Sequence, residues 1–158
     1  MSRRIIIGKK LPQPDLNYNN LLLSILINRI LKDGKKELAR KIVYKAYELI
    51  RTRTSYYNIL KLIERAIKHS SPKVCLKIWK FKKRTNVTIR KIPIFLSRFK
   101  SINLGIKLIV IYAKKRPGKN IAIKLANEIM DASQFSGNAV RKKEELHKAA
   151  EANRAFVM

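Results

Sequence analysis

Apolar residues recur along most of this chain with a period of about 3.6, the spacing that places them on one face of an α-helix. Six such stretches are present, at about residues 17–32, 35–51, 56–69, 104–115, 120–136 and 138–154. The second has the longest stripe, which consists of Leu38, Ala39, Ile42, Val43, Ala46, Leu49 and Ile50. The pattern therefore predicts a mainly helical protein.

Residues that start or stop helices divide these stretches. Gly34 follows Asp33 at the end of the first, where glycine readily adopts the left-handed conformation of a helix end. Ser55 is our expected N-cap for the third helix, and Pro72 prevents that helix from continuing. We expect the fifth helix to begin near Asn120 and to stop at Gly137.

Between residues 73 and 95 the apolar period changes from 3.6 to 2, which is typical of β-strands. The alternation predicts two strands around a turn that contains Lys82, Lys83 and Arg84, with Cys75 as a strand side chain. An isolated two-stranded hairpin is only marginally stable in water. We therefore expect a projecting arm whose basic tip is held by a ligand.

Residues 1–16 have two prolines and several basic side chains but no apolar period, so they predict an extended arm that orders on a partner. Residues 17–158 then form one domain. The expected fold is mainly α, a bundle of about six helices with a protruding two-stranded β-hairpin and a basic extended N-terminal arm.

Charge narrows the choice of partner. The 158 residues include 37 Lys and Arg but only 10 Asp and Glu, a net charge of +27. No acidic residue occurs between Glu64 and Glu128. Such a chain repels itself unless a polyanion neutralises it, and nucleic acid is the commonest such partner. An anionic membrane is the weaker alternative, because the apolar runs are far shorter than the roughly 20 residues of a membrane span.

Groups for catalysis or metal binding are scarce. His147 lies near glutamates, but the surrounding lysines oppose a bound cation, so we favour a surface or RNA-facing role for it and for His69. A single cysteine excludes an internal disulfide and a thiolate-rich metal cluster. The segments Gly8-Lys9-Lys10 and Gly118-Lys119-Asn120 lack the upstream glycine and the following Ser or Thr of a phosphate-binding loop. We expect no cofactor, no metal and no small-molecule substrate.

The basic clusters at predicted helix ends are the candidate binding residues. Each could be a solvated face, and lysines at a helix C-terminus also complement its dipole, but phosphate contact is the interpretation that we favour. The candidates are Lys32, Gly34, Lys35 and Lys36; Lys114, Lys115, Arg116 and Lys119; Arg141, Lys142 and Lys143; and Arg3, Arg4, Lys9 and Lys10 in the arm. Because Lys35, Lys36, Lys115 and Arg116 lie at helix ends and in loops outside the apolar stripes, we expect their substitution by Ala to leave the fold intact.

Four short motifs occur along the chain in the same order as in a known protein family. They are Asp33-Gly34-Lys35-Lys36, Ala113-Lys114-Lys115-Arg116, Leu125-Ala126-Asn127-Glu128, and the run from Gly137 to Glu144 that continues from His147 to Phe156. In this order and spacing the chain resembles, nearly end to end, the universal small-subunit ribosomal protein seven family in its bacterial and organellar form.

The resemblance implies a helical bundle with a protruding hairpin and no enzymatic activity. It further implies a primary rRNA-binding protein that nucleates assembly of the subunit head on the 3′ domain of small-subunit rRNA and lies near the tRNA exit site. By this likeness Lys77 and Lys80 join the clusters above as rRNA contacts. The residues implied to face tRNA, mRNA or a neighbouring ribosomal protein are Lys82, Lys83, Arg84, His147, Asn153 and Arg154.

The chain departs from the family at the hairpin, where Lys82-Lys83-Arg84 replaces the usual Val-Gly-Gly tip, and it ends two residues after Phe156. Rival hypotheses are a DNA-binding protein with Gly34 in a helix-turn-helix and an RNA-modifying enzyme. The 22 isoleucines and 24 lysines suggest an AT-rich genome. With no transit peptide apparent, we expect a ribosome in the plastid stroma, the alternative being the cytoplasm of an AT-rich bacterium.

Overall fold

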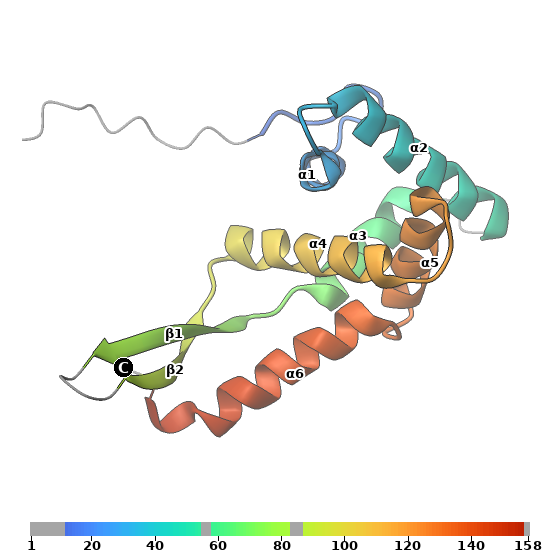
Figure 1. Ribbon diagram of the computed structural model, residues 1–158. Helices are drawn as coiled ribbons and strands as arrows, with labels where there is room; N and C mark the ends of the chain where they lie inside the picture. The colour runs from blue at the N-terminus through green and yellow to red at the C-terminus, as the bar shows by residue number, and fades with distance from the viewer. Residues whose placement is uncertain (1–11, 55–57, 83–86, 157–158) are drawn as a thin grey trace, which may run out of the picture.

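The computed structural model describes residues 12–54, 58–82 and 87–156. This part of the chain folds into six α-helices, a two-stranded antiparallel sheet and a terminal 3-10 turn (Figure 1). In chain order the elements are α1 (Leu21–Ile30), α2 (Lys36–Arg53), α3 (Ile59–Ser70), β1 (Val74–Lys82), β2 (Val87–Phe95), α4 (Arg98–Lys115), α5 (Ile121–Ser133), α6 (Asn138–Ala152) and η1 (Arg154–Phe156). The predicted fold class, helices with one hairpin, is confirmed.

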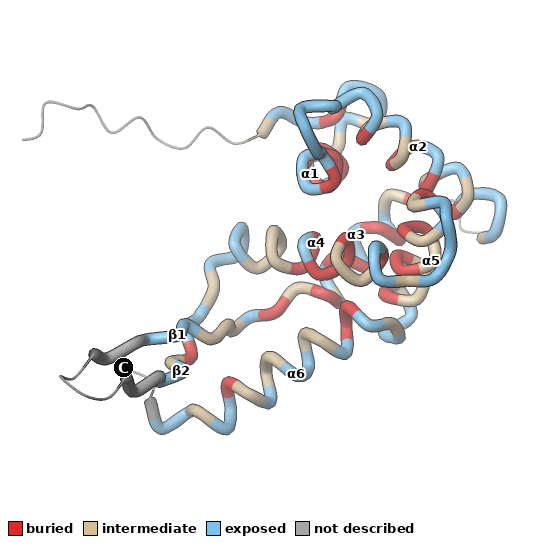
Figure 2. The backbone as a smooth tube through the Cα atoms, in the orientation of Figure 1, coloured by how far each residue is buried: buried red, intermediate tan, exposed pale blue. Residues whose placement is uncertain are grey.

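The core lies where α5 packs against α2, α3 and α4 (Figure 2). Its side chains come from the predicted stripes: Ala39, Val43, Ala46 and Ile50 on α2 are all buried. Leu38 was expected in the same stripe but is 55% exposed, because it lies in the first turn of α2 and lines a surface pocket instead of the core. Burial of the other stripe residues is the main force that holds these helices together.

Three helices begin at an asparagine whose side-chain oxygen accepts backbone N–H bonds. Asn20 caps α1, Asn58 caps α3 and Asn120 caps α5. The expected start of the first helix at residue 17 was therefore wrong, since Asn19 has φ 44° and helical geometry begins only after Asn20. Asn58 also takes the role that we had assigned to Ser55, which lies outside the described residues.

Gly137 does not stop α5. That helix ends at Ser133, and Gly137 (φ 103°) is instead the N-cap of α6. A Cβ at Gly137 would lie 3.2 Å from Asp131 Cβ and 3.4 Å from Glu128 Oε1, so the chain passes tightly against α5 here. Glycine therefore serves both the backbone angle and the close packing.

The hairpin extends alongside α6, away from the helices of the core (Figure 1). Its register runs from Val74 opposite Phe95 to Lys82 opposite Val87, and Cys75 is a half-buried strand residue as expected. Residues 83–86 lie outside the described residues, as do residues 1–11 of the expected arm. Closer to α1, Asp15 is buried and accepts a hydrogen bond of 2.8 Å from the Tyr44 hydroxyl on α2.

Candidate nucleic-acid interface

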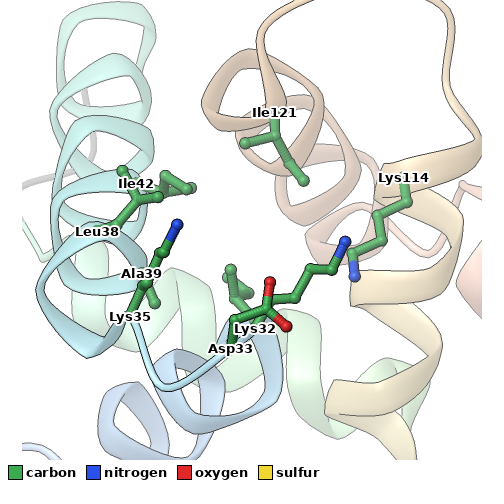
Figure 3. Close-up of a pocket in the computed structure, with 9 residues that line it drawn as sticks. Lys32, Asp33, Lys35, Leu38, Ala39, Ile42, Lys114 and Ile121 are labelled. Atoms are coloured by element: carbon green, nitrogen blue, oxygen red, sulfur yellow. The ribbon is translucent and has the colours of Figure 1, made fainter.

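A surface pocket of about 350 Å³ gathers three of the predicted lysines (Figure 3). Lys32 and Lys35 come from the α1–α2 loop, and Lys114 comes from the last turn of α4. Figure 3 shows the side chains of Lys32 and Lys114 pointing toward one another. The apolar lining consists of Ile30, Leu38, Ala39, Ile42 and Ile121, and Asp33 completes the pocket. Separate segments of the chain therefore place cations around an apolar floor.

The α1–α2 loop reverses direction through two left-handed residues. Asp33 has φ 52° and Gly34 has φ 71°, and the loop is closed by a 2.8 Å hydrogen bond from Lys36 N–H to Gly34 C=O. No atom lies within 4 Å of the position that a Cβ of Gly34 would occupy, so the glycine is there for its backbone angle. The open side of the loop leaves its backbone accessible to a ligand.

The charges around this pocket are poorly balanced. Within the described part of the chain, Lys32, Lys35 and Lys114 form no ion pair, and the only acid that lines the pocket is Asp33. The C-terminal dipole of α4 favours Lys114 and Lys115, whereas Lys35 and Lys36 lie at the N-terminus of α2, where the dipole opposes positive charge. An anionic ligand would relieve that repulsion.

Arg116, which was predicted as a phosphate contact, has two partners within the protein. Its guanidinium forms ion pairs with Glu128 and Asp131 of α5, and Nε lies 2.6 Å from Glu128 Oε2. Burial lowers the pKa of Arg116, but the hydrogen bonds to Asp131 and Glu128 outweigh burial and raise the pKa overall. Glu128 is fully buried, so Arg116 supports the fold, contrary to our expectation that its substitution leaves the fold intact.

Glu128 also joins α5 to α6, because its Oε1 accepts the Ala139 N–H at 3.0 Å. Two members of the predicted cluster Arg141-Lys142-Lys143 also have partners within the protein. Lys142 pairs with Glu145 at 2.6 Å, and Lys143 Nζ donates to the His69 carbonyl at 2.7 Å. Only Arg141 of these three is both exposed and without an ion pair among the described residues. Its position at the start of α6 leaves it facing solvent.

Comparison with known proteins decides the family. The profile of the family described as Ribosomal protein S7p/S5e matches residues 2–154. The chain is a member of this family. It is 43% identical to the Small ribosomal subunit protein uS7c of Trieres chinensis over 148 residues, which cover 94% of this chain and 90% of the relative. It is 40% identical over 156 residues to uS7 proteins of Thermosynechococcus vestitus and Trichormus variabilis, covering 99% of this chain and 97% of each relative.

Membership of the S7p/S5e family makes the chain a structural constituent of the ribosome and not an enzyme. The hypothesis of an RNA-modifying activity is therefore set aside. Among the described residues no three His, Cys, Asp or Glu side chains are grouped to hold a metal ion. No helix in the same residues has the length and apolarity needed to cross a bilayer.

In this ribosomal protein, three of the remaining candidates belong to strand β1 and one to the loop before α5. Lys77 Nζ lies 5.2 Å from the centre of the Trp79 ring on β1, and Lys80 and Lys82 belong to the same strand. Lys119 is exposed in the loop before α5. Lys83, Arg84, Arg3, Arg4, Lys9 and Lys10 lie outside the described residues. Trp79 is 46% exposed, so Lys77 and Trp79 together present a charged and an aromatic group.

At the far end of α6, His147 has a structural contact. Its Nε2 accepts the Lys73 N–H at 3.1 Å, which ties the start of β1 to α6. Burial, followed by the charges of Lys143 and Lys73, lowers the pKa of His147, and this favours the neutral ring that can accept the bond. Asn153 Nδ2 donates to Ala149 C=O at 2.7 Å, and Arg154 is exposed. Arg154 is thus a charge of the expected exit-site set that is open to a partner.

Sequence reasoning missed one group of cations. Lys68, Lys73 and Arg98 come from α3, from the residue before β1 and from α4, and they line one pocket with Leu22, Ile67 and Ile102. The available signal was the absence of any acid between Glu64 and Glu128. That signal indicates a strongly basic region but not which residues meet.

Proposed function

We propose that this protein is a primary rRNA-binding protein of the small ribosomal subunit, which nucleates assembly of the subunit head on the 3′ domain of the rRNA. The observation that carries the proposal is the pocket where Lys32, Lys35 and Lys114 converge without ion pairs in the described structure. Phosphate contacts from such lysines fix the register of a protein on folded RNA, and the shape of the helices selects the site. Lys36 and Lys115 follow Lys35 and Lys114 directly in the chain, and both are exposed, as are Lys119 and Arg141.

Binding to a transcript of the rRNA 3′ domain tests this proposal. With roughly six to ten phosphate contacts, affinity is expected to fall about a thousandfold or more between about 50 and 200 mM salt. The variant Lys32→Gln/Lys35→Gln/Lys114→Gln should reduce the slope of log K against log salt by about three, with an unchanged circular dichroism spectrum.

The matched control is Lys41→Gln/Lys45→Gln/Arg51→Gln, which removes the same charge from exposed positions of α2. We expect this control to retain most of the wild-type slope. Equal losses in the two triple variants would show that net charge, and not the pocket, determines binding. Duplex DNA that competes as well as the rRNA transcript at matched salt would favour the DNA-binding hypothesis instead.

We further propose that the hairpin and the end of α6 lie toward the exit site, near tRNA, mRNA and a neighbouring ribosomal protein. The support is their position at the end of the molecule opposite to α1 and α2 (Figure 1). The variant Lys82→Ala/Lys83→Ala/Arg84→Ala should bind the 3′ domain normally and enter the subunit, but impair exit-site function. Complete loss of primary rRNA binding in this variant would contradict the division of roles.

The proposed location is the ribosome of a plastid. The uS7c relative of Trieres chinensis, at 43% identity, favours a plastid over the alternative of an AT-rich bacterium. The cyanobacterial relatives are slightly less similar, at 40% identity. Fractionation of the source cells, with detection of the protein in plastid ribosomes or in bacterial cytoplasmic ribosomes, would decide between the two.

A further inference from the structure

A second basic pocket, of about 540 Å³, lies where α3, α4 and the start of β1 meet. Its floor is apolar, from Leu22, Ile67 and Ile102, and its basic residues are Lys68, Lys73 and Arg98. The pocket is at the N-terminal end of α4, whereas Lys114 and the first pocket are at the C-terminal end. Along an 18-residue helix these ends are about 25 Å apart, so the two pockets are separate sites.

The three cations cannot be explained by helix ends alone. Lys68 lies in the last turn of α3, where the dipole favours a cation, but Arg98 begins α4, where the dipole disfavours one. Lys73 belongs to the connecting segment before β1. None of the three forms an ion pair within the described residues. The fold therefore brings together exposed positive charges that it does not neutralise.

The walls of the pocket are fixed by polar contacts and close packing. Ser71 Oγ donates to Ile67 C=O at 2.6 Å, and Ser101 Oγ donates to Pro72 C=O at 2.7 Å. A Cβ at Gly105 of α4 would lie only 2.5 Å from Ser71 Oγ, so this helix and the segment after α3 are in direct contact. The serine hydroxyls line the pocket and keep lone pairs that can accept hydrogen bonds.

Lys73 is held in place from both sides. Its N–H donates to His147 Nε2 at 3.1 Å, and its C=O accepts from Leu96 N–H at 2.9 Å. The one acid lining the pocket, Glu64, accepts a 3.4 Å hydrogen bond from Asn20 Nδ2. A fixed backbone with a solvent-exposed ammonium group is a suitable arrangement for contact with a phosphate.

We propose that this pocket binds an unpaired nucleotide of rRNA, at a site separate from the first lysine pocket. This inference rests on the proposed function. Lys68, Lys73 and Arg98 contact the phosphates on either side of the nucleotide, and the base lies on Leu22, Ile67 and Ile102. The ribose 2′-hydroxyl donates to Ser71 or Ser101. A paired base has both faces stacked, whereas an unpaired one can place a face on apolar side chains, which is why the apolar floor selects single-stranded RNA.

Binding of the full-length protein to the 3′-domain transcript provides the first test. Lys68→Gln/Lys73→Gln/Arg98→Gln should reduce the salt slope by about three relative to wild type, while Lys41→Gln/Lys45→Gln/Arg51→Gln should not. Circular dichroism should show the same helix content in both variants. A slope equal to that of the control would overturn the proposal. If the wild-type protein fails to bind the transcript at all, the proposed function itself fails.

Lysine acetylation followed by mass spectrometry provides a second test that does not depend on the transcript. An eight-residue oligouridine should protect Lys68 and Lys73 at low salt, and an RNA duplex of equal length should protect them much less. Lys41 and Lys45 serve as the unprotected reference. Equal protection by the duplex would show a phosphate-only surface. Stronger protection by hexaglutamate than by oligouridine would assign the pocket to an acidic protein segment, and either result would overturn the proposal.

Discussion

Lys114 and Arg116 are two residues apart at the end of α4, yet the structure uses their charges in opposite ways. Arg116 turns inward to Glu128 and Asp131, and it has become part of the junction between α4, α5 and α6. Lys114 turns outward to the pocket that it shares with Lys32 and Lys35. A run of basic residues can therefore contain both a structural charge and a ligand-binding charge.

The difference lies in the cation and in the carboxylates within its reach. Arginine presents a planar fork that can bond two carboxylates at once, and α5 supplies both, one of them completely buried. No carboxylate of the described chain pairs with Lys114. We therefore expect substitutions at the two positions to separate effects on folding from effects on RNA binding.

The largest expected effect is that of Arg116→Ala on stability. It leaves the buried Glu128 carboxylate without its cation and should lower the free energy of unfolding by about 3 kcal/mol or more, whereas Lys114→Ala should change it by less than about 0.5 kcal/mol. Urea unfolding followed by circular dichroism measures both. Arg116→Lys should fall between them, since one ammonium cannot replace the two-carboxylate contact.

If Arg116→Ala and Lys114→Ala unfold at the same urea concentration, the comparison fails. Should Arg116→Ala not fold at all, Arg116→Lys still decides the matter. A stability equal to that of the wild-type protein would show that the junction does not depend on arginine geometry.

The elements of the fold were largely predictable, because the apolar periods of α2 and α5 are set by local sequence. The residues at which the helices begin and end were less predictable. Gly137 suits both a helix stop and a helix start, and only its packing against Asp131 and Glu128 of α5 makes it the N-cap of α6. Asn58 and Ser55 are equally good caps by residue type, and the choice depends on where the chain turns toward α3.

The candidate site was predictable as a set of charges but not as a set of contacts. Local spacing can suggest pairs three or four residues apart, such as Lys142 with Glu145, but not Arg116 with carboxylates 12 and 15 residues away. Lys68, Lys73 and Arg98 were missed for the same reason, since they belong to three segments that meet only in the folded protein. Which cations remain for a ligand depends on tertiary structure.

The next effect concerns Gly137, which tests the same junction without changing any charge. Gly137→Ala forces a Cβ toward Asp131 and Glu128 at φ 103°, a backbone angle that residues with side chains avoid. We expect a loss of about 1–3 kcal/mol in the free energy of unfolding. Gly34→Ala is the matched control, because φ is also positive there but the space is open, so its loss should be smaller. Equal losses would show that backbone strain alone matters.

A smaller effect is expected for Lys114 in RNA binding. Lys114→Gln should reduce the salt slope for the 3′-domain transcript by about one, which amounts to about fourfold less affinity lost between 50 and 200 mM salt. The exposed Lys45→Gln on α2 provides the control, with an expected change near zero. If the two variants have the same slope, Lys114 is a solvated charge, and the inference that it binds RNA is wrong.

The smallest expected effect concerns Lys73 and His147. The backbone N–H of Lys73 donates a hydrogen bond to His147 within the fold, whereas the side chain of Lys73 faces a pocket. The pKa of His147 in the folded protein is lowered from its ordinary value of 6.5, so the unfolded chain takes up the proton more readily. The stability that this histidine contributes is therefore complete above about pH 6.5 and is lost as the pH falls through the folded-state pKa. Urea unfolding at pH 7.5 and 5.5 should show a greater loss for wild type than for His147→Gln, whose amide oxygen can accept the Lys73 N–H at either pH. Identical losses would mean that the neutral imidazole does not help to hold β1 on α6.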